Sequence, residues 1–520
     1  MIFLEWILFF FVIQLIHFLG TWRLYQKAGR KAWEAAIPVY NAVVLMKIIH
    51  RPWWWTILLF IPVVNLIMFP VVWVETIRSF GKSSTTDTIL VILTLGLYIF
   101  YVNYVADVAY KKERTLQPGS VAGEWISSIL FAIVAATIVH TYVMQPFTIP
   151  TSSLEKTLLV GDYLFVSKFH YGARTPMTSV SFPMVHDTIP VLGIKSYLNA
   201  PQIPYFRLPG FQNIERNDIV VFNWPVDTVR QFFDRSGARY DKPVDKKSNY
   251  VKRAVGLPGD SLKIVDGKIY INNEPLQLPE RAKPQYSYFG TTTGQGFHPN
   301  ILREYDITDG IGYDPNTNQF VIQALSEEAY QRLKNNPNVA TIERVRAPES
   351  EKDVRIFPNN RKVNWNQDNM GSVYIPKRGE TVQMNLTSFS LYRRIIEDYE
   401  GHEMGIDNQL SVDGTQVLLN GNPITSYTFK QDYYWMMGDN RHNSEDSRYW
   451  GYVPENHVVG KPVFIWLSID PNGSGFDKIR WERMFTTVGG QGQPVSYLPY
   501  FLILIVGWFG YSYFRKKKKS

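Results

Sequence analysis

An apolar run that ends shortly before a serine constrains this chain most. Residues 125–143 contain no Asp, Glu, Lys or Arg, and as a helix rising about 1.5 Å per residue they cover roughly 28 Å, enough to cross a bilayer core. Ser153 follows ten residues later, in Phe147-Thr-Ile-Pro-Thr-Ser-Ser-Leu-Glu-Lys-Thr-Leu158. The sequence therefore predicts a serine hydroxyl held just outside a membrane.

Four further apolar segments are candidates for membrane helices. They are residues 2–20, 53–74, 88–105 and 497–514. The first segment lacks a basic n-region and a small-residue cleavage signature, so we expect it to remain as an anchor. Together with 125–143, the pattern predicts about five transmembrane helices, four of them N-terminal and one C-terminal.

The positions of Lys and Arg orient these helices, because short cytoplasmic loops are enriched in both residues. Segment 21–52 carries an excess of basic residues, segment 106–124 carries Lys111, Lys112 and Arg114, and Arg515 is followed by four lysines. Segment 75–87 has as many acidic as basic residues. We therefore expect a multi-pass protein in which residues 146–496 form one large extracytoplasmic body.

The net charge of +8 could indicate a nucleic-acid partner, but part of the excess lies in the loops that flank the membrane segments. Nucleic-acid binding is therefore not expected. The chain contains no cysteine, which excludes disulfides and thiol catalysis.

Short strands separated by turns dominate the extracytoplasmic part, for example residues 218–222, 261–265 and 268–271. We predict a mainly β catalytic domain with an inserted α+β lobe that contains helices at 326–334 and 391–399. Residues 410–424 resemble 265–276 in their Asp-Gly turn and later Asn and Pro. The predicted organisation is an N-terminal membrane region (1–124), a transmembrane helix (125–145), a first β part (146–277), the lobe (278–409), a second β part (410–487), a linker (488–496), and a C-terminal helix with a basic tail (497–520).

Ser153 needs a base before it can act as a nucleophile. His170, His186 and His442 are among the histidines of the extracytoplasmic part, but the serine is not in a Gly-x-Ser-x-Gly context, which disfavours a histidine-based triad. Lysine is the other option. Lys252 is followed by Arg253-Ala-Val-Gly-Leu-Pro-Gly-Asp260, and neutrality near pH 7 would require its pKa to fall by about 3, which burial can produce. From spacing alone, the favoured interpretation is that Lys252 is a surface residue beside Arg253.

A third segment, residues 437–451, gathers turn formers, a hydroxyl and opposite charges. Ser444 could orient an amine, and Asp446 with Arg448 could fix the loop. The alternative is a charged surface turn.

Together these segments resemble bacterial type I signal peptidase (signal peptidase I), the membrane-bound enzyme that removes signal peptides from exported proteins. The family's serine segment reads Phe-x-Ile-Pro-Ser-x-Ser-Met-x-Pro-Thr-Leu, which places Ser153 at the nucleophile. Lys252 falls on the general base within Lys-Arg-Ala-Val-Gly-Leu-Pro-Gly-Asp, and residues 216–222 resemble Arg-Gly-Asp-Ile-Val-Val-Phe. Leu154 replaces the usual Met and Lys156 the usual Pro, and these changes affect packing and loop shape.

The resemblance implies a Ser/Lys-dyad serine endopeptidase in the bacterial inner membrane, with its catalytic domain in the periplasm. It implies that Thr151 and the Ser153 N–H form the oxyanion hole, and that Ser444, Asp446 and Arg448 orient and support the base. It also implies shallow pockets for the small residues of an A-x-A site, lined by Phe147, Ile149, Tyr250 and Val251.

The implied partners are preproteins with signal peptides, the lipid bilayer and the export machinery, and neither a cofactor nor a metal is expected. A non-catalytic membrane scaffold that keeps the same fold is the alternative, and loss of Ser153 or Lys252 would favour it. A nucleotide-dependent transporter is rejected, because Thr76 stands where a phosphate-binding loop before Lys82 needs its first glycine.

Overall fold

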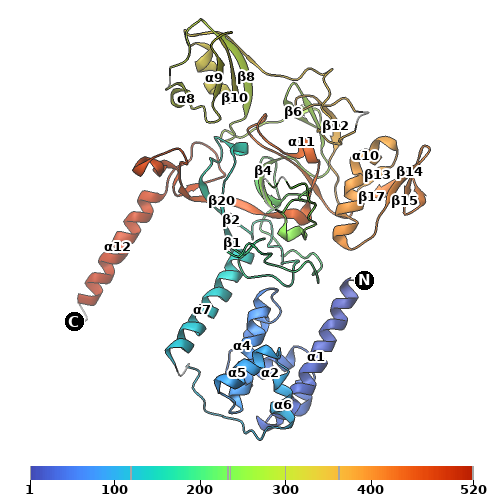
Figure 1. The fold of residues 1–520 in the computed structure, drawn as a ribbon, viewed down its shortest axis with the longest axis vertical. Coiled ribbons are helices and arrows are strands. Elements are labelled where there is room, and N and C mark those ends of the chain that lie inside the picture. The colour runs from blue at the N-terminus through green and yellow to red at the C-terminus, as the bar shows by residue number, and fades with distance from the viewer. Residues whose placement is uncertain are drawn as a thin grey trace. The chain divides into compact units, whose positions relative to one another are not determined.

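The computed structural model describes residues 2–117, 120–230, 234, 236–298, 300–360 and 363–517. The chain divides into two compact units, which are considered separately (Figure 1). The first unit comprises Met1–Val143 and Thr175–Phe206, and the second comprises Met144–Arg174 and Arg207–Ser520.

The first unit is built from helices around a core of Leu, Ile, Val and aromatic side chains. A buried Glu75 pairs with Arg51 and Arg114. The helices are α1 (Ile2–Lys27), η1 (Ala32–Ala35), α2 (Tyr40–Ile48), α3 (Trp55–Leu58), α4 (Val64–Ser79), α5 (Thr85–Leu93), α6 (Tyr98–Tyr104), α7 (Val121–Ile138) and the π-helical η2 (Val139–Val143).

Two described helices are long and apolar enough to cross a membrane, Leu4–Lys27 and Val121–Val143. A third span results if Thr85–Leu93 and Tyr98–Tyr104, which meet at a bend of 118°, are one segment. The bend contains Leu95 and Gly96 with positive φ. The predicted span at 53–74 is divided between α3 and α4, near Pro62, because proline disfavours helical backbone at the residue before it. The prediction of about five transmembrane helices is therefore not confirmed.

The second unit contains the main antiparallel sheet, whose described strands follow the order β1-β2-β20-β3-β4-β18-β19, with β21 beside β20. β20 lies between β2 and β3, and β18 lies next to β4. Strands that are far apart in the sequence are therefore neighbours in the sheet. The bounds are β1 (Met144–Thr148), β2 (Asp162–Ser167), β3 (Ile219–Asn223), β4 (Asn249–Gly256), β18 (Tyr433–Met437), β19 (Val453–Pro454), β20 (Val458–Ser468) and β21 (Thr486–Thr487).

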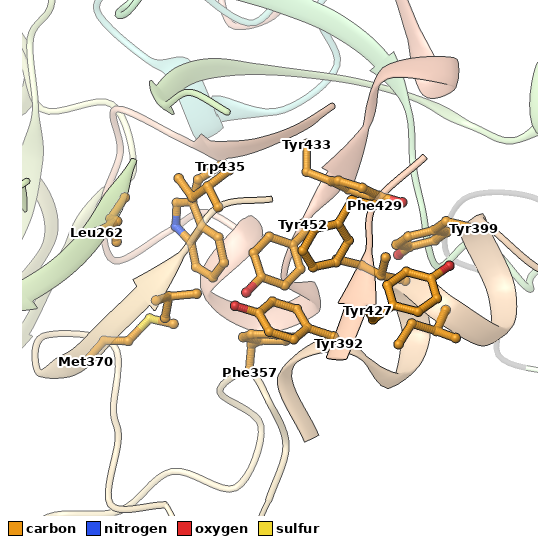
Figure 2. Close-up of a cluster of buried hydrophobic side chains, with 14 of the residues drawn as sticks. Leu262, Phe357, Met370, Tyr392, Tyr399, Tyr427, Phe429, Tyr433, Trp435 and Tyr452 are labelled. Atoms are coloured by element: carbon orange, nitrogen blue, oxygen red, sulfur yellow. The ribbon is translucent and has the colours of Figure 1, made fainter. Parts of the chain in front are cut away.

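An aromatic core underlies β18 (Figure 2). Tyr433 and Trp435 are fully buried there, and the Trp435 and Tyr452 rings meet edge to face at 5.7 Å. Elements on both sides of position 409 contribute to this region. They are β5 (Ser261–Val265), β6 (Lys268–Ile271), β7 (Glu274–Pro275), β12 (Met370–Tyr374), β13 (Thr381–Gln383), α10 (Leu386–Arg394), the π-helical η5 (Ile395–Tyr399), β14 (Leu410–Asp413), β15 (Gln416–Leu419), β16 (Asn422–Ile424) and β17 (Ser426–Thr428).

The two similar sequence segments have similar forms. β5, β6 and β7 form an antiparallel meander, as do β14, β15 and β16. Asp266-Gly267 makes the first turn of one meander, whereas in the other Asp413 is the last residue of β14 and the turn is Gly414-Thr415. In each, the third strand contains a proline, Pro275 or Pro423. A proline is tolerated here because each third strand ends its described sheet.

The inserted body, defined as residues 285–344, has a sheet and a core of its own. Its strand order is β11-β8-β10-β9, and Ser326 caps α9 by accepting from the Ala329 N–H. The predicted lobe at 278–409 differs from this body, because β12 pairs with β5 and β13 pairs with β17, outside the lobe. The bounds are β8 (Gln285–Thr292), α8 (Ile301–Glu304), β9 (Ile311–Asp314), β10 (Gln319–Ser326), α9 (Glu327–Lys334) and β11 (Val339–Arg344).

Arg281 holds the segment that the sequence predicts as a linker. Its guanidinium donates to the carbonyls of Thr487, Gly489 and Gly492 at 3.1, 2.6 and 2.7 Å, and α12 follows. The other described helices are η3 (Ser152–Leu154), η4 (Val244–Lys246), η6 (His402–Met404), α11 (Ser447–Trp450), η7 (Glu455–His457), η8 (Gly475–Lys478), η9 (Trp481–Arg483) and α12 (Leu498–Lys517).

Candidate active site

A short 3-10 helix, η3, carries Ser153. After β1 the chain passes through Pro150 into this turn, and Leu154 is buried at 1 % exposure in the core beneath the sheet. The Leu158 N–H donates to the Leu154 carbonyl at 2.8 Å. The buried leucine fixes the turn, and Ser153 beside it is itself only 7 % exposed.

Lys252 reaches this serine from β4. Its Nζ lies 2.5 Å from Ser153 Oγ, although the two residues are 99 positions apart. β4 pairs with β3 along Asn249–Arg253 and with β18 along Arg253–Gly256. These ladders fix the register of Lys252 in the sheet. Lys252 is 3 % exposed.

Burial lowers the pKa of Lys252 to about 8, because the charged ammonium loses its water. Asp446 and Glu445 favour the charged form and oppose this shift, whereas Arg448 adds to it. The Tyr250 ring centroid lies 5.3 Å from Nζ. A lysine in this environment is neutral in a useful fraction of molecules near pH 7, so it can accept a proton from the serine.

We expect cleavage by this site to rise with pH, because only neutral Lys252 can act as a base. Below a pKa of about 8, each lower pH unit reduces the neutral fraction about tenfold. A profile of kcat/KM between pH 6 and 10 should therefore rise and then level off above about pH 8. Burial also raises the pKa of Glu155 to about 7, so Glu155→Gln is the control. A profile that becomes flat in this variant would contradict the assignment to Lys252.

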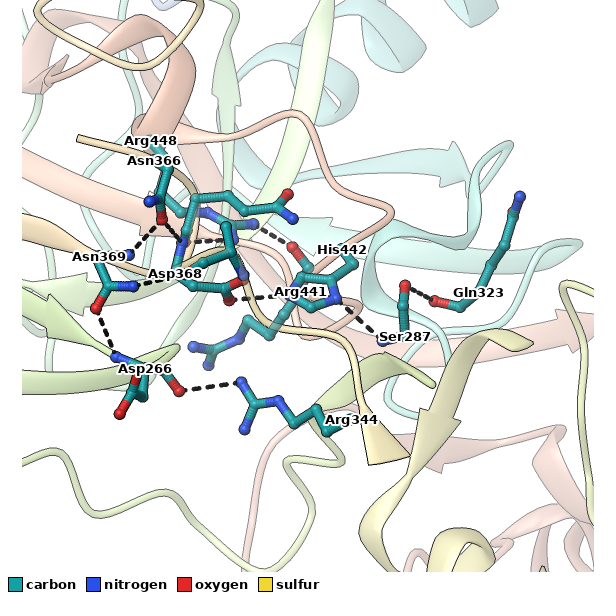
Figure 3. A network of polar contacts seen from close by, with 12 residues as sticks. Asp266, Ser287, Gln323, Arg344, Asn366, Asp368, Asn369, Arg441, His442 and Arg448 are labelled. Atoms are coloured by element: carbon teal, nitrogen blue, oxygen red, sulfur yellow. Dashed lines mark hydrogen bonds and ion pairs between the residues drawn. The ribbon is translucent and has the colours of Figure 1, made fainter. Parts of the chain in front are cut away.

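Asp446 and Arg448 form a buried pair that supports the loop after β18. Arg448 donates from Nε and Nη2 to the Asp446 carboxylate at 2.9 and 2.8 Å. Its Nη2 also donates to the Arg441 carbonyl at 2.5 Å, a contact visible in Figure 3. The Gly438 N–H donates to Asp446 at 3.1 Å. The structure thus places the predicted supporting pair close to Lys252, the predicted base.

Ser444 and Thr151 are placed near the site, but Ser444 does not make the predicted hydrogen bond to Lys252. Within the described part of the chain, the buried Ser444 Oγ has no hydrogen-bond partner, although it lies against Gly438. Thr151 is exposed and makes no side-chain cap to η3. Their roles stay predictions. Over those same residues, no group of three or more His, Asp or Glu side chains is arranged to hold a metal ion.

Gly438 packs tightly between Ser444 and the turn that carries Ser153. A methyl group on it would lie 2.2 Å from Ser444 Oγ and 2.6 Å from the Ser153 carbonyl oxygen. We expect Gly438→Ala to displace the serine and reduce kcat about 100-fold, the cost of a misplacement near 1 Å. Gly312→Ala is the control, because the added methyl group would lie an ordinary 3.9 Å from the Val321 carbonyl oxygen. Equal rates for both variants, measured by precursor cleavage, would refute this expectation.

The predicted substrate-binding residues separate into two groups. Phe147, Ile149 and Val251 pack together in the core beneath β1 and β4. Tyr250 faces the opposite way, because neighbouring strand residues alternate, and it stacks on Trp224 at 5.2 Å. Only the first three can therefore belong to one apolar surface.

Sequence reasoning did not single out Asp439 and Asn440, which stand just before the predicted supporting residues. Asp439 is fully buried and accepts from Arg253 Nε and Nη2 at 2.8 and 2.6 Å and from Thr157 Oγ1 at 2.7 Å. The Asn440 N–H donates to the Ser153 carbonyl at 3.1 Å. The Gly-Asp-Asn run in the third segment was the available signal.

Comparison with known proteins agrees with this geometry. The family described as "Signal peptidase, peptidase S26" matches residues 122–467, which is most of the chain, and the protein belongs to that family. Residues 33–113 match a second family described as being of unknown function (DUF5684).

Three relatives, each named signal peptidase I, illustrate the similarity. The protein from Buchnera aphidicola subsp. Acyrthosiphon pisum is 25 % identical over 348 residues, covering 67 % of this chain and 76 % of its own. The Haemophilus influenzae protein is 24 % identical over 399 residues (73 % and 79 %). The Helicobacter pylori protein is 26 % identical over 378 residues (70 % and 92 %).

Proposed function

We propose that this protein is a membrane-bound serine endopeptidase that removes N-terminal signal peptides from exported preproteins after an A-x-A-type site. One observation carries the proposal: the 2.5 Å contact between the buried Lys252 Nζ and Ser153 Oγ. Membership of the signal peptidase S26 family supplies the reaction class.

The reaction begins when neutral Lys252 accepts the Ser153 proton and Ser153 Oγ attacks the scissile carbonyl. The oxyanion is stabilised by the Ser153 N–H and the Thr151 hydroxyl. Collapse of the intermediate breaks the peptide bond, and the protonated lysine gives its proton to the departing amine. Neutral Lys252 then activates the water that hydrolyses the ester, which restores the serine.

The substrate binds as an extended strand between β1 and β4. Two features support this mode. β1 ends the described sheet, and the β18 ladder on β4 stops at Arg253, before Val251 and Lys252. Phe147, Ile149 and Val251 then form shallow pockets for small side chains, while Tyr250 borders the lysine.

The protein is proposed to be a multi-pass protein of the bacterial inner membrane, with about five spans and its catalytic domain in the periplasm. The two candidate spans and the Lys and Arg residues of segments 21–52 and 106–124 support this placement. Contact with the export machinery is proposed from the same location, where preproteins emerge.

The test is cleavage of a precursor with an A-x-A signal peptide by the full-length protein in detergent or vesicles. We expect one cut at the predicted site, located by mass spectrometry, and no product from Ser153→Ala. Inactivity of the folded wild type on several such precursors would favour the non-catalytic scaffold. Cleavage by Ser153→Ala at the wild-type rate would exclude Ser153 as nucleophile.

A further inference from the structure

The inserted body contacts the loop that carries Ser153. Lys156, three residues after the serine, pairs through Nζ with the Asp306 carboxylate at 2.8 Å. The Lys156 side chain is 13 % exposed and its backbone has φ of +70°. A lysine in left-handed backbone is strained, so neighbouring contacts must hold this turn.

A second carboxylate of the same body, Asp309, holds the loop on the other side of the serine. Its Oδ2 accepts from Asn440 Nδ2 at 2.9 Å and from Asn443 Nδ2 at 2.8 Å. The same two amides donate to the Ser152 carbonyl at 3.2 Å and to Ser152 Oγ at 3.1 Å. Asp309 therefore orients both amides that hold the residue before the nucleophile.

The inserted body is also fastened to the 439–442 segment by backbone. The Gln285 N–H donates to the Asp439 carbonyl at 2.8 Å, and the Arg441 N–H donates to the Gln285 carbonyl at 2.9 Å. The Ser287 N–H donates to His442 Nδ1 at 3.0 Å (Figure 3). The loop with Asp306 and Asp309 thus extends from a body that is already anchored beside the site.

From these contacts we infer that Asp306 and Asp309 are positioning residues for Ser153. Asp309 has the larger effect on the position of the serine. This inference rests on the proposed peptidase function. It gives the inserted body a role in catalysis, because it fixes the serine turn from outside the main sheet. It also accounts for Lys156, which stands where the resemblance expects proline: the lysine provides the partner for Asp306.

Asp309 contributes more than Asp306 to the positioning of Ser153, because the two carboxylates differ in exposure and in the hydrogen bonds that they accept. The Asp306 side chain is 72 % exposed, and an exposed ion pair contributes little to stability. Asp309 accepts two hydrogen bonds at a single oxygen, and hydrogen bonds to a charged group are stronger than neutral ones. Both variants should fold, because the inserted body has its own buried core.

The experiment compares Asp309→Ala, Asp309→Asn and the control Glu328→Ala in the full-length protein. Glu328 is an exposed residue of α9 in the same body. We expect Asp309→Ala to lower kcat for precursor cleavage about 10- to 100-fold, as misplaced reacting groups do, with KM changed less than threefold. Asp309→Asn should recover most of the rate, because its amide oxygen can accept both bonds.

A charge exchange tests Asp306. Lys156→Glu should lower kcat, and adding Asp306→Lys should restore part of it. Wild-type kcat in Asp309→Ala, or equal loss in Asp309→Ala and Asp309→Asn, would overturn the positioning role.

Hydrogen exchange separates this inference from the proposed function. Amides of residues 151–158 should exchange faster in Asp309→Ala than in Glu328→Ala, whether or not the protein cleaves precursors. Unchanged exchange would refute the inference. An inactive wild-type protein, in contrast, would refute only the proposed peptidase function.

Discussion

Lys252→Met is expected to abolish precursor cleavage while the protein stays folded. Methionine has a similar length but no amine, so Ser153 loses the group 2.5 Å from its oxygen. Loss of one member of a nucleophile–base unit typically costs about 10⁴-fold or more in kcat. The measurement is the rate of product formation by the full-length variant.

The same substitution is expected to stabilise the fold at neutral pH. The pKa of Lys252 is about 8 in the folded protein and about 10.4 in an unfolded chain. The unfolded state therefore binds more protons between these values. The charged lysine costs the fold about 3 kcal/mol below pH 8, and this cost is relieved as pH rises toward about 10.4. Lys252→Met should raise Tm at pH 7, with a gain that shrinks above pH 8.

Lys268→Met is the matched control, because Lys268 is exposed on β6. It should leave both kcat and its pH dependence unchanged. Activity in Lys252→Met above one hundredth of wild type would show that another group serves as the base. A lower Tm at pH 7 would show that the charged amine stabilises the fold.

Asp439→Asn is expected to cause the largest loss of stability. The carboxylate pairs with Arg253 inside the protein, and the two side chains are 0 % and 3 % exposed. A neutral amide of the same size leaves the Arg253 charge buried without compensation, which costs about 3–5 kcal/mol. Thermal unfolding of the full-length protein in detergent should show a lowered Tm.

Asp353→Asn is the control for this effect. Asp353 pairs with Arg355, whose side chain is 76 % exposed, and such pairs contribute about 1 kcal/mol or less. Removing both buried partners, in Asp439→Leu with Arg253→Met, should cost less than the two single changes together. Equal Tm values for Asp439→Asn and Asp353→Asn would contradict the importance of the buried pair.

Local signals predicted the parts of the fold that local chemistry determines. Residues 261–265 and 268–271 are strands with the predicted bounds, because Asp-Gly between them supplies positive φ for the turn. Ser326 begins a helix by capping it. The predicted helix at 391–399 instead begins at Leu386 and becomes π-helical from Ile395.

Local sequence patterns did not predict the long-range contacts. The resemblance of the three segments to signal peptidase I indicated Ser153 and Lys252, and the structure brings these two side chains together. Nothing local connects Asp309 with Asn440, which are 131 positions apart. The breaks in the apolar segments lie at single residues, Pro62 in one and Leu95 with its positive φ in the other, and hydropathy averages conceal such residues.

The position of β20 between β2 and β3 has a consequence for the order of biosynthesis. Ribosomes make Ser153 and Lys252 early, but Asp446 and Arg448 follow nearly 200 residues later, and β2 and β3 have no shared neighbour until Val458–Ser468 exists. A nascent chain that already displays both reactive side chains therefore has an incomplete sheet. We therefore expect the catalytic arrangement to be complete only after β20 has been synthesised.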